Sequence, residues 1–328
     1  ISRFDGVDTL FGYANELMAL LTLGKYDSVS IHFLHPHMWG TISNFFQQHR
    51  FHLFLHGHGA RSWSRVFDPA GGYEALRGAK SASDLYLDMW QTLMREADLP
   101  ESFIFVSKWM RKCAEDDMHV SFPESRCHVI NNPINIDTFK YHEKQKNHAK
   151  RILMIRNFDK FQYGTDIALR CIEELQRRSI WKDLSFSIYG QGHNLSALKE
   201  RFVDEPNVAV HERFLSAREI AAAHRDHGIM LIPTRWDSQG VSRDEAMASG
   251  LVPATNSVCA IPEFVDESCA ILAEGEDHLA LADGIERLAT SPQIFLQMSA
   301  RAAEKVRNRS RYADTIGREL TVLGIAPR

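Results

Sequence analysis

The stretch 233-PTRWDSQGVSRDEAMASGLVPA-254 decides the fold, because a strand end, a glycine-containing turn, a helix and a second strand follow one another within it. The apolar run GIMLIPT (228–234) leads into the loop that carries Asp237. Gly250 ends the helix as a C-cap, and LVPATN (251–256) begins the next strand. Strand, loop, helix and strand in this order form the unit from which parallel α/β sheets are built.

The same alternation continues through the rest of the chain, in which short runs rich in Val, Ile and Phe are separated by helical segments. We expect strands in the first half at 28–34, 51–57, 102–107 and 127–133. In the second half we expect strands at 151–156, 184–190, 207–212, 228–234 and 251–256, with helices at about 165–178, 194–203, 217–225, 242–249 and 278–290. The chain is therefore predicted to be an α/β protein with two Rossmann-like domains.

The domain boundaries follow from a polar, charge-rich segment in the middle of the chain. Residues 1–133 are expected to form the first domain, 134–150 a linker, 151–295 the second domain, and 296–328 C-terminal helices that pack back on the first domain. The two parallel sheets would place their carboxyl ends along a shared cleft, where ligands of open α/β sheets bind. No strand is expected before the helix in DGVDTLFGYANELMALL (5–21), and the first residue is Ile1, so the start resembles a cut from a longer polypeptide with a truncated first domain.

Composition limits the possible partners of a chain of this length. Of the 328 residues 44% are apolar and 24% charged, and the net charge of -4 provides no basic field for nucleic acid. Five scattered cysteines indicate reduced thiols in a cytoplasm rather than a disulfide framework or zinc cluster. No apolar run approaches the roughly 20 residues that span a bilayer. A peripheral contact with the inner face of a membrane stays open.

Two carboxylates eight positions apart, Asp237 and Glu245, frame the turn of the opening stretch. We expect the helix to begin at Ser242, because SRDE reads as a capping box in which Ser242 and Glu245 bond reciprocally. The amides of Gly240, Val241 and Ser242 would then favour an anion such as phosphate. Asp237 suits sugar hydroxyls and Glu245 a ribose diol. The alternative is that Glu245 only caps the helix and Asp237 is a solvated loop acid.

The stretch resembles the E-x7-E signature of retaining, nucleotide-sugar-dependent glycosyltransferases of family 4 and its relatives, which have the GT-B fold. The segment EAMASG, the following proline and IPE at 261–263 coincide with that pattern, whereas the first acid is Asp237 instead of glutamate. The segments VINNPINIDTF (129–139) and IYGQG (188–192) are similar to further motifs of the family. The resemblance covers about residues 28–290.

The resemblance also implies roles for cations and a histidine. Arg156 stands at the family's arginine position, where it would stabilise the departing diphosphate. Gln162 stands where a lysine is expected, and Lys160, two residues earlier, is the candidate replacement unless it is a solvated surface lysine. His56, with His58 beside it, corresponds to a histidine near donor sugar and acceptor. The alternative for His56 is a loop histidine bonded only to backbone.

The remaining candidates concern the donor and a metal. Arg213 and Phe214 follow a strand end where related enzymes recognise the base, with packing as the alternative for Phe214. Gly190 in IYGQG is assigned to donor binding, although two glycines alone are a weak signal. The His-rich run HFLHPHMW (32–39) has no acid beside it, and no metal or other cofactor is expected.

Together these features predict a retaining glycosyltransferase that moves a sugar from a nucleotide-diphosphate-sugar donor to an acceptor hydroxyl, with no protein nucleophile. The expected acceptor is a saccharide or lipid-linked saccharide in bacterial surface polysaccharide (lipopolysaccharide or capsule) synthesis. Two alternatives remain open, because a fold does not fix the chemistry. One is a nucleotide-sugar epimerase of GT-B fold. The other is a non-catalytic sugar-binding domain of a larger synthase.

Overall fold

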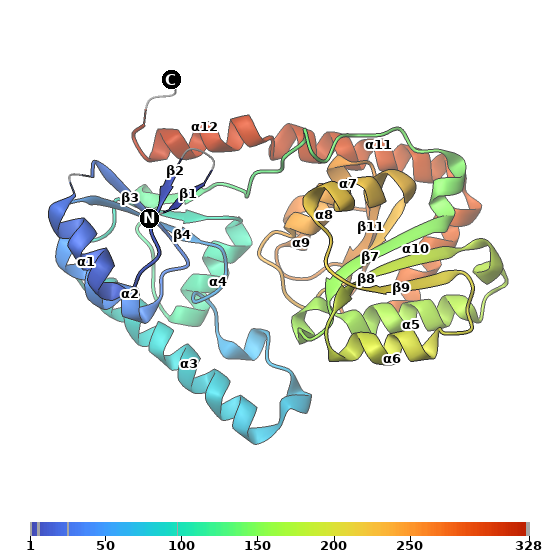
Figure 1. The fold of residues 1–328 in the computed structure, drawn as a ribbon, viewed down its shortest axis with the longest axis horizontal. Coiled ribbons are helices and arrows are strands. Elements are labelled where there is room, and N and C mark those ends of the chain that lie inside the picture. The colour runs from blue at the N-terminus through green and yellow to red at the C-terminus, as the bar shows by residue number, and fades with distance from the viewer. Residues whose placement is uncertain (1, 5–6, 25, 97, 326–328) are drawn as a thin grey trace. The chain divides into compact units, whose positions relative to one another are not determined.

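The computed structural model describes residues 2–4, 7–24, 26–96 and 98–325. Within them the chain divides into two compact units, each built on a parallel sheet (Figure 1). The first unit takes residues from 1–64, 73–130 and 320–328, and the second takes 65–72 and 131–319. The prediction of two Rossmann-like domains is confirmed. No helix among the described residues has both the length and the apolar character that a membrane crossing requires.

The first unit contains a four-stranded parallel sheet in the order β3 (Ser28–His32), β4 (Arg50–Leu55), β5 (Ser102–Phe105) and β6 (Cys127–Val129). The apolar residues of β4 and β5 are buried on both faces, as expected for central parallel strands. The strand predicted at 127–133 ends early, at Val129, because its neighbour β5 ends at Phe105. The helices of this unit are α1 (Ala14–Leu23), α2 (Pro36–Ile42), α3 (Gly72–Leu93) and α4 (Lys108–Met118).

The start of the chain differs from the prediction. Two short antiparallel strands, β1 (Ser2–Phe4) and β2 (Val7–Thr9), precede α1, so the expectation of no strand before the helix was wrong. They form a sheet of their own and add nothing to the parallel sheet. The helix begins later than expected, at Ala14, because the Glu16 carboxylate accepts a hydrogen bond from the Tyr13 amide at 2.8 Å and caps it there.

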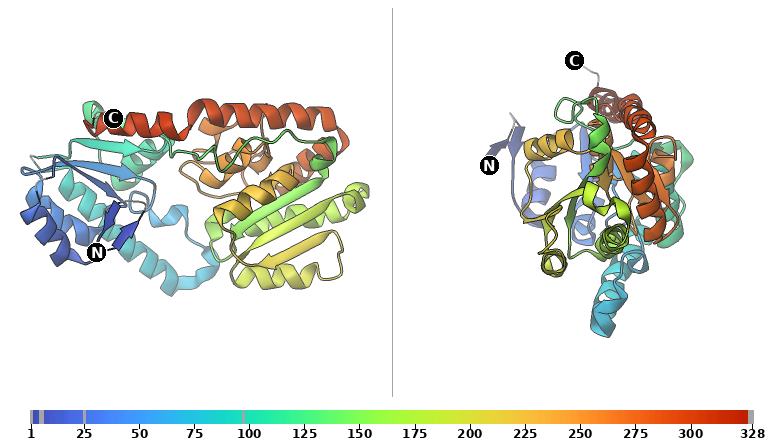
Figure 2. Two further views of the ribbon diagram at one scale, coloured as in Figure 1. Left: turned by 45° about the horizontal axis from the view of Figure 1, so that its top comes forward. Right: turned by 90° about the vertical axis from the view of Figure 1, so that its right-hand side faces the viewer.

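Helix α3 is unusual because only its last turns are packed. Its buried residues are Met89, Trp90 and Leu93, whereas most of the preceding residues are exposed or half-buried. Figure 2 shows the helix extending away from the four-stranded sheet. No helix was predicted at 72–93.

The second unit contains a six-stranded parallel sheet in the order β12-β11-β10-β7-β8-β9. The strands are β7 (Arg151–Asn157), β8 (Ser185–Gln191), β9 (Val208–Glu212), β10 (Ile229–Leu231), β11 (Val252–Asn256) and β12 (Ile271–Ala273), of which β12 was not predicted. The chain builds outward from β7 to β9, returns to the other side of β7, and builds outward again from β10. The order therefore reverses between β7 and β10, which is the place where sheets of this type bind ligands.

Helices cover both faces of this sheet (Figures 1 and 2). They are α5 (Thr165–Gln176), α6 (His193–Arg201), α7 (Ala217–Asp226), α8 (Val241–Ala248), α9 (Ile261–Phe264), α10 (His278–Thr290) and α11 (Pro292–Arg309). After α11 the chain continues into α12 (Tyr312–Val322), whose last residues belong to the first unit. The larger core lies under α5 and α10, with Ile167 and Ile285 at its centre. The smaller core packs Ala246 of α8 on Leu153 and Met230.

Residues 134–150, the predicted linker, belong to the second unit. They bury Ile134, Phe139 and Ala149 and end in a 3-10 turn (Lys146–Lys150) that leads directly into β7. At the other end of the chain, Val322 and Leu323 pack on a core of the first unit formed by Phe54, Ile104 and Ile130, in which Ile104 is central.

Candidate functional site

A pocket of about 410 Å³ lies at the reversal point of the second unit's sheet. Three chain segments form most of its lining: the end of β7 with the loop after it, the loop that follows β10, and the first turn of α8. All of the lining residues belong to the second unit. The opening stretch of the sequence therefore forms one wall of the pocket, at the carboxyl ends of the strands.

Gly240 ends the loop and starts α8. Its backbone is left-handed (φ 94°, ψ 58°), which glycine adopts without the steric cost that other residues incur. It is the N-cap, no side chain caps the helix, and Val241 is the first helical residue. The predicted capping box was therefore wrong, because Ser242 lies inside the first turn, where it cannot act as the N-cap. An uncapped helix start has free amide donors and the positive end of the helix dipole, which suit an anion.

Asp237 lines the pocket from the loop before this turn and is half-buried. Its Oδ1 accepts a hydrogen bond from the Gln239 amide at 3.1 Å, and its backbone carbonyl accepts one from the Ala260 amide at 3.3 Å. These bonds fix the carboxylate in an Asx turn. Because one oxygen is engaged, the other is the one available to a ligand hydroxyl.

Arg156 lines the pocket from the end of β7. Its Nη2 donates to the carbonyls of Ile232 and Pro233 at 3.4 and 3.3 Å, and the guanidinium lies 5.0 Å from the Tyr163 ring centroid. Burial lowers the pKa of Arg156, and the Asp237 carboxylate opposes that effect. Nε has no hydrogen-bond partner within the described part of the chain. The cation is thus held in place through Nη2, and its buried Nε is available to a ligand.

Lys160 and Gln162 lie on different pockets. Gln162 lines the main pocket, and its carbonyl accepts hydrogen bonds from the Arg235 amide (2.8 Å) and the Thr234 hydroxyl (2.9 Å), which joins two loops. Lys160 is exposed and lines a neighbouring pocket of about 240 Å³ together with Asp166. The position predicted for a phosphate-binding lysine is therefore occupied by a neutral amide.

Glu245 lies one turn along α8 from the pocket wall. It shares the less buried helix face with Val241 and Ser242, both of which line the pocket, but Glu245 itself does not. Its carboxyl group has no hydrogen-bond partner among the described residues, and it is half-buried. Burial, and secondly the nearby Asp244 carboxylate, raise the pKa of Glu245 to about 7. A ligand hydroxyl that donated to this group would stabilise its ionised form.

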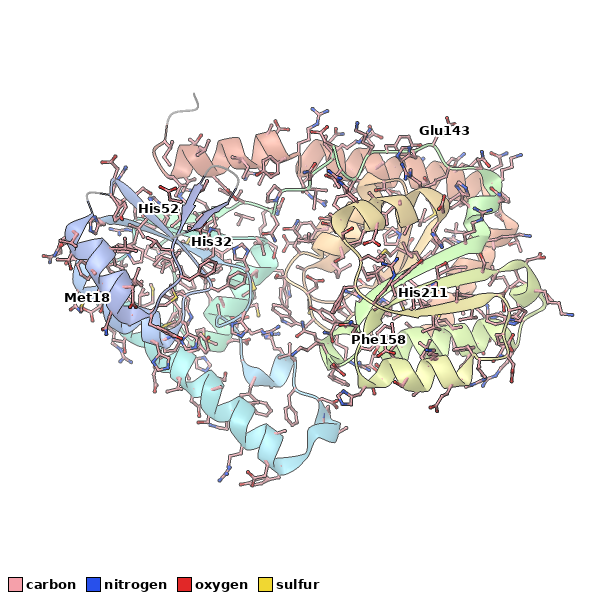
Figure 3. The ribbon with its side chains drawn as sticks, viewed as in Figure 1. Met18, His32, His52, Glu143, Phe158 and His211 are labelled. Atoms are coloured by element: carbon pink, nitrogen blue, oxygen red, sulfur yellow. The ribbon has the colours of Figure 1, made fainter. Side chains whose placement is uncertain are left out.

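Gly190 is buried in β8 and does not line the pocket. A Cβ at this position would lie 2.0 Å from the Arg156 carbonyl oxygen and 2.7 Å from the Phe158 ring, which Figure 3 labels beside β7. The missing side chain lets β7 and β8 pair closely just before the pocket. Close packing of the strands thus accounts for this glycine.

Arg213 and Phe214 follow β9. Phe214 is 59% exposed and lines the pocket, so its ring offers a surface on which a planar group can stack. Arg213 does not line the pocket. Its guanidinium pairs with Glu219 at 2.7 Å and lies 5.7 Å from the centroid of the Tyr189 ring, on the surface of the second unit.

His56 belongs to the first unit, directly after β4. Its Nε2 lies 2.8 Å from Nδ1 of His32, so the two rings share a hydrogen bond in which one donates and the other accepts. His32 is labelled in Figure 3. The neighbouring Phe33 has a left-handed backbone (φ 58°), and its ring centroid lies 4.8 Å from that of His56. Burial lowers the pKa of His32 and, beside Arg61, that of His58.

Two functional candidates were missed at the sequence level. Gln239 is buried, and its side chain accepts from the Asn132 amide (2.6 Å) and donates to the Asn132 carbonyl (3.2 Å). Arg243 is 1% exposed yet lines the pocket. The sequence signal that could have revealed Arg243 is the adjacent pair Arg243–Asp244. These are two charged residues on the side of the helix that also carries the buried Ala246. No group of three or more His, Cys, Asp or Glu side chains suited to a metal occurs in the described residues.

Fold, pocket and family comparison agree on the class of protein. Residues 149–291, all within the second unit, match the family model described as "Glycosyl transferases group 1", which indicates a glycosyltransferase. The two Rossmann-like units have the fold of the GT-B glycosyltransferases.

Among curated proteins the chain is similar to D-inositol 3-phosphate glycosyltransferase of Corynebacterium diphtheriae, with 25% identity over 168 residues. That match covers 49% of this chain and 39% of the relative, so the chain spans about two fifths of the relative's length. Sucrose-phosphate synthase from Thermosynechococcus elongatus has the same fold, with a TM-score of 0.72, 13% identity, and coverage of 94% of this chain and 76% of that one. Anabaena HepE in complex with UDP and glucose gives a TM-score of 0.68 at 13% identity and covers 97% and 84%.

Proposed function

We propose that this protein transfers a sugar from a nucleotide-diphosphate-sugar donor to an acceptor hydroxyl. The observation that carries the proposal is the pocket at the sheet's reversal point, where Arg156 and the uncapped start of α8 line one cavity with Asp237. A cation and helix amides suit a diphosphate, and a fixed carboxylate suits sugar hydroxyls. The transferred sugar and the diphosphate leaving group of the donor would thus be held by different residues of one pocket.

Each residue then has a task that follows from its chemistry. The distal phosphate lies at the amides of Gly240 and Val241, and Arg156 neutralises the charge that develops as the sugar leaves. Asp237 accepts from hydroxyls of the transferred sugar, and Phe214 stacks on the base. Glu245, on the same face of α8, accepts from the ribose diol. The departing phosphate assists deprotonation of the acceptor, so that the stereochemistry is retained without a protein nucleophile or a metal.

The identity of the donor and acceptor also belongs to this proposal. The fold shared with HepE, whose structure contains UDP and glucose, makes UDP-glucose the first donor to test. The resemblance of the ordered sequence motifs supports a saccharide or lipid-linked saccharide acceptor in surface polysaccharide synthesis, in the cytoplasm.

The test is mass analysis after incubation with UDP-, GDP- and dTDP-sugars and mixed saccharide acceptors. Transfer predicts free nucleoside diphosphate together with an acceptor whose mass has increased by one sugar residue. An epimeric sugar formed without acceptor would show the epimerase alternative instead. Binding of the donor without formation of any product would support the alternative of a non-catalytic sugar-binding domain. Asp237→Asn should remove the product, whereas Lys160→Ala, on the neighbouring pocket, is the matched control that should retain it.

A further inference from the structure

Arg243 projects from the first turn of α8 and is the largest buried charged side chain of the pocket wall. Its Nε and Nη2 donate to Oδ1 of Asp244 at 3.1 and 2.7 Å. The third nitrogen, Nη1, is buried and has no hydrogen-bond partner among the described residues. A buried donor of a charged group without a partner is unfavourable, which points to an acceptor that binds there.

The position of Nη1 identifies where that acceptor would lie. A methyl group built on Gly240 would lie 2.9 Å from Nη1, so the nitrogen sits against the turn that starts the helix. Gly240 is also the N-cap, beside which the free amides of the first turn begin. Nη1 and the helix start therefore converge on the same corner of the pocket, and both favour an anion.

The surroundings leave Arg243 with a surplus of positive charge. Its partner Asp244 is fully buried and also accepts from Arg309 Nη2 (3.2 Å) and Gln239 Nε2 (3.2 Å). Two guanidinium groups thus share one carboxylate, and the cluster carries a net charge of +1. The Phe264 ring lies under both, with its centroid 5.2 Å from Cζ of Arg243 and 4.6 Å from that of Arg309.

Charge in the pocket decides between a structural and a ligand-binding role. The charged side chains that line it are Arg156, Asp237 and Arg243. The charges of Arg156 and Asp237 alone would sum to zero, which does not neutralise the negative charge of a diphosphate. With Arg243 the lining becomes cationic at the corner beside Gly240. Among the described residues that line this pocket, Arg243 is the second cation beside Arg156, since Lys160 lines the neighbouring pocket.

We propose that Arg243 Nη1 donates to a non-bridging oxygen of the distal phosphate of a nucleoside diphosphate and thereby makes the pocket discriminate diphosphates from monophosphates. This inference rests on the proposed function, because it assigns the donor's diphosphate to this corner. Arg243 recognises the phosphate together with the amides at Gly240 and Val241, while Arg156 approaches from the end of β7.

The experiment is calorimetric titration of wild type, Arg243→Met and Arg243→Lys with UDP and UMP, with GDP and GMP as the second pair. Arg243→Met leaves Asp244 paired with Arg309, a neutral pair, so the variant should fold. We expect it to weaken diphosphate binding about 10- to 100-fold while the monophosphate stays within about 3-fold of wild type, as for loss of one charged hydrogen bond. Arg243→Lys keeps the charge and should retain most of the discrimination, and it serves as the test if the methionine variant does not fold.

The outcomes separate the two proposals. Equal weakening of diphosphate and monophosphate, or no change in either, would overturn the role of Arg243 while the proposed donor site stands. Arg218→Met, at an exposed arginine of α7 that does not line the pocket, is the matched control and should bind the diphosphate within about 3-fold of wild type. If wild type binds neither diphosphate, the proposed function fails first and the role of Arg243 fails with it.

Discussion

Replacement of Glu245 by glutamine should remove a pH dependence of stability that the structure predicts for the wild type. The ordinary pKa of a glutamate is 4.5, and burial raises that of Glu245 to about 7. Between these values the folded protein keeps a proton that the unfolded chain has released, so the free energy of unfolding decreases as pH rises. Each pH unit in that range is worth 1.36 kcal/mol, so wild type should lose about 3 kcal/mol between pH 4.5 and 7 and little more above it.

The assay is urea unfolding of wild type and Glu245→Gln from pH 5 to pH 8, followed by circular dichroism. Glutamine stays neutral, so the variant should match wild type near pH 5 and exceed its stability at pH 8 by up to about 3 kcal/mol. Ser242→Ala is the control and should keep the wild-type pH dependence. If Glu245→Gln and wild type change in parallel over the whole range, the carboxyl group ionises normally and the reasoning is refuted.

The remaining predictions concern packing, charge and the ribose contact. Gly190→Ala should destabilise the second unit by about 3 kcal/mol or more, because its Cβ would meet the Arg156 carbonyl at 2.0 Å. Gly78→Ala is the control, since its Cβ would meet no atom within 4 Å, and it should be neutral or slightly stabilising. Thermal unfolding measures both. Gln162→Lys should tighten diphosphate binding about 10-fold in calorimetry, since it adds a cation to the main pocket, and an unchanged dissociation constant would contradict that placement. Nucleotide affinity should rise about 10-fold from pH 6 to pH 8 in wild type but not in Glu245→Gln, because the ribose diol donates to the ionised carboxylate; an identical pH profile for a 2′,3′-dideoxy nucleotide would argue against the ribose contact.

Much of the second unit could be predicted from the sequence. Its strands are short apolar runs between clear turn residues, and parallel strands buried on both faces leave such a pattern. The strand β12 was missed because Ile271–Ala273 is only three residues long. The start of α8 was misassigned because SRDE satisfies the capping-box pattern, whereas the left-handed Gly240 started the helix two residues earlier.

The candidate site could be predicted only in part. Arg156 lies at the end of β7 and Asp237 lies in the loop after β10, and the ends of these adjacent parallel strands meet at one edge of the sheet. The separation of Lys160 from Gln162 could not be predicted, because it depends on the path of the short 3-10 turn Phe161–Tyr163. Arg243 was overlooked because a charged residue in a helix is usually exposed, and its burial depends on Asp244 and on Arg309, which lies 66 positions later in the chain.

Hydrogen–deuterium exchange with and without the best-binding nucleoside diphosphate tests the central claim most directly, because it locates the ligand on the chain. The pocket between β7 and β10 predicts slower exchange in peptides that cover 155–163 and 233–245. Peptides from α6, such as 193–201, provide the internal control and should be unchanged. Protection confined to the first unit, or absent at saturating ligand, would contradict a nucleotide-diphosphate site at the start of α8.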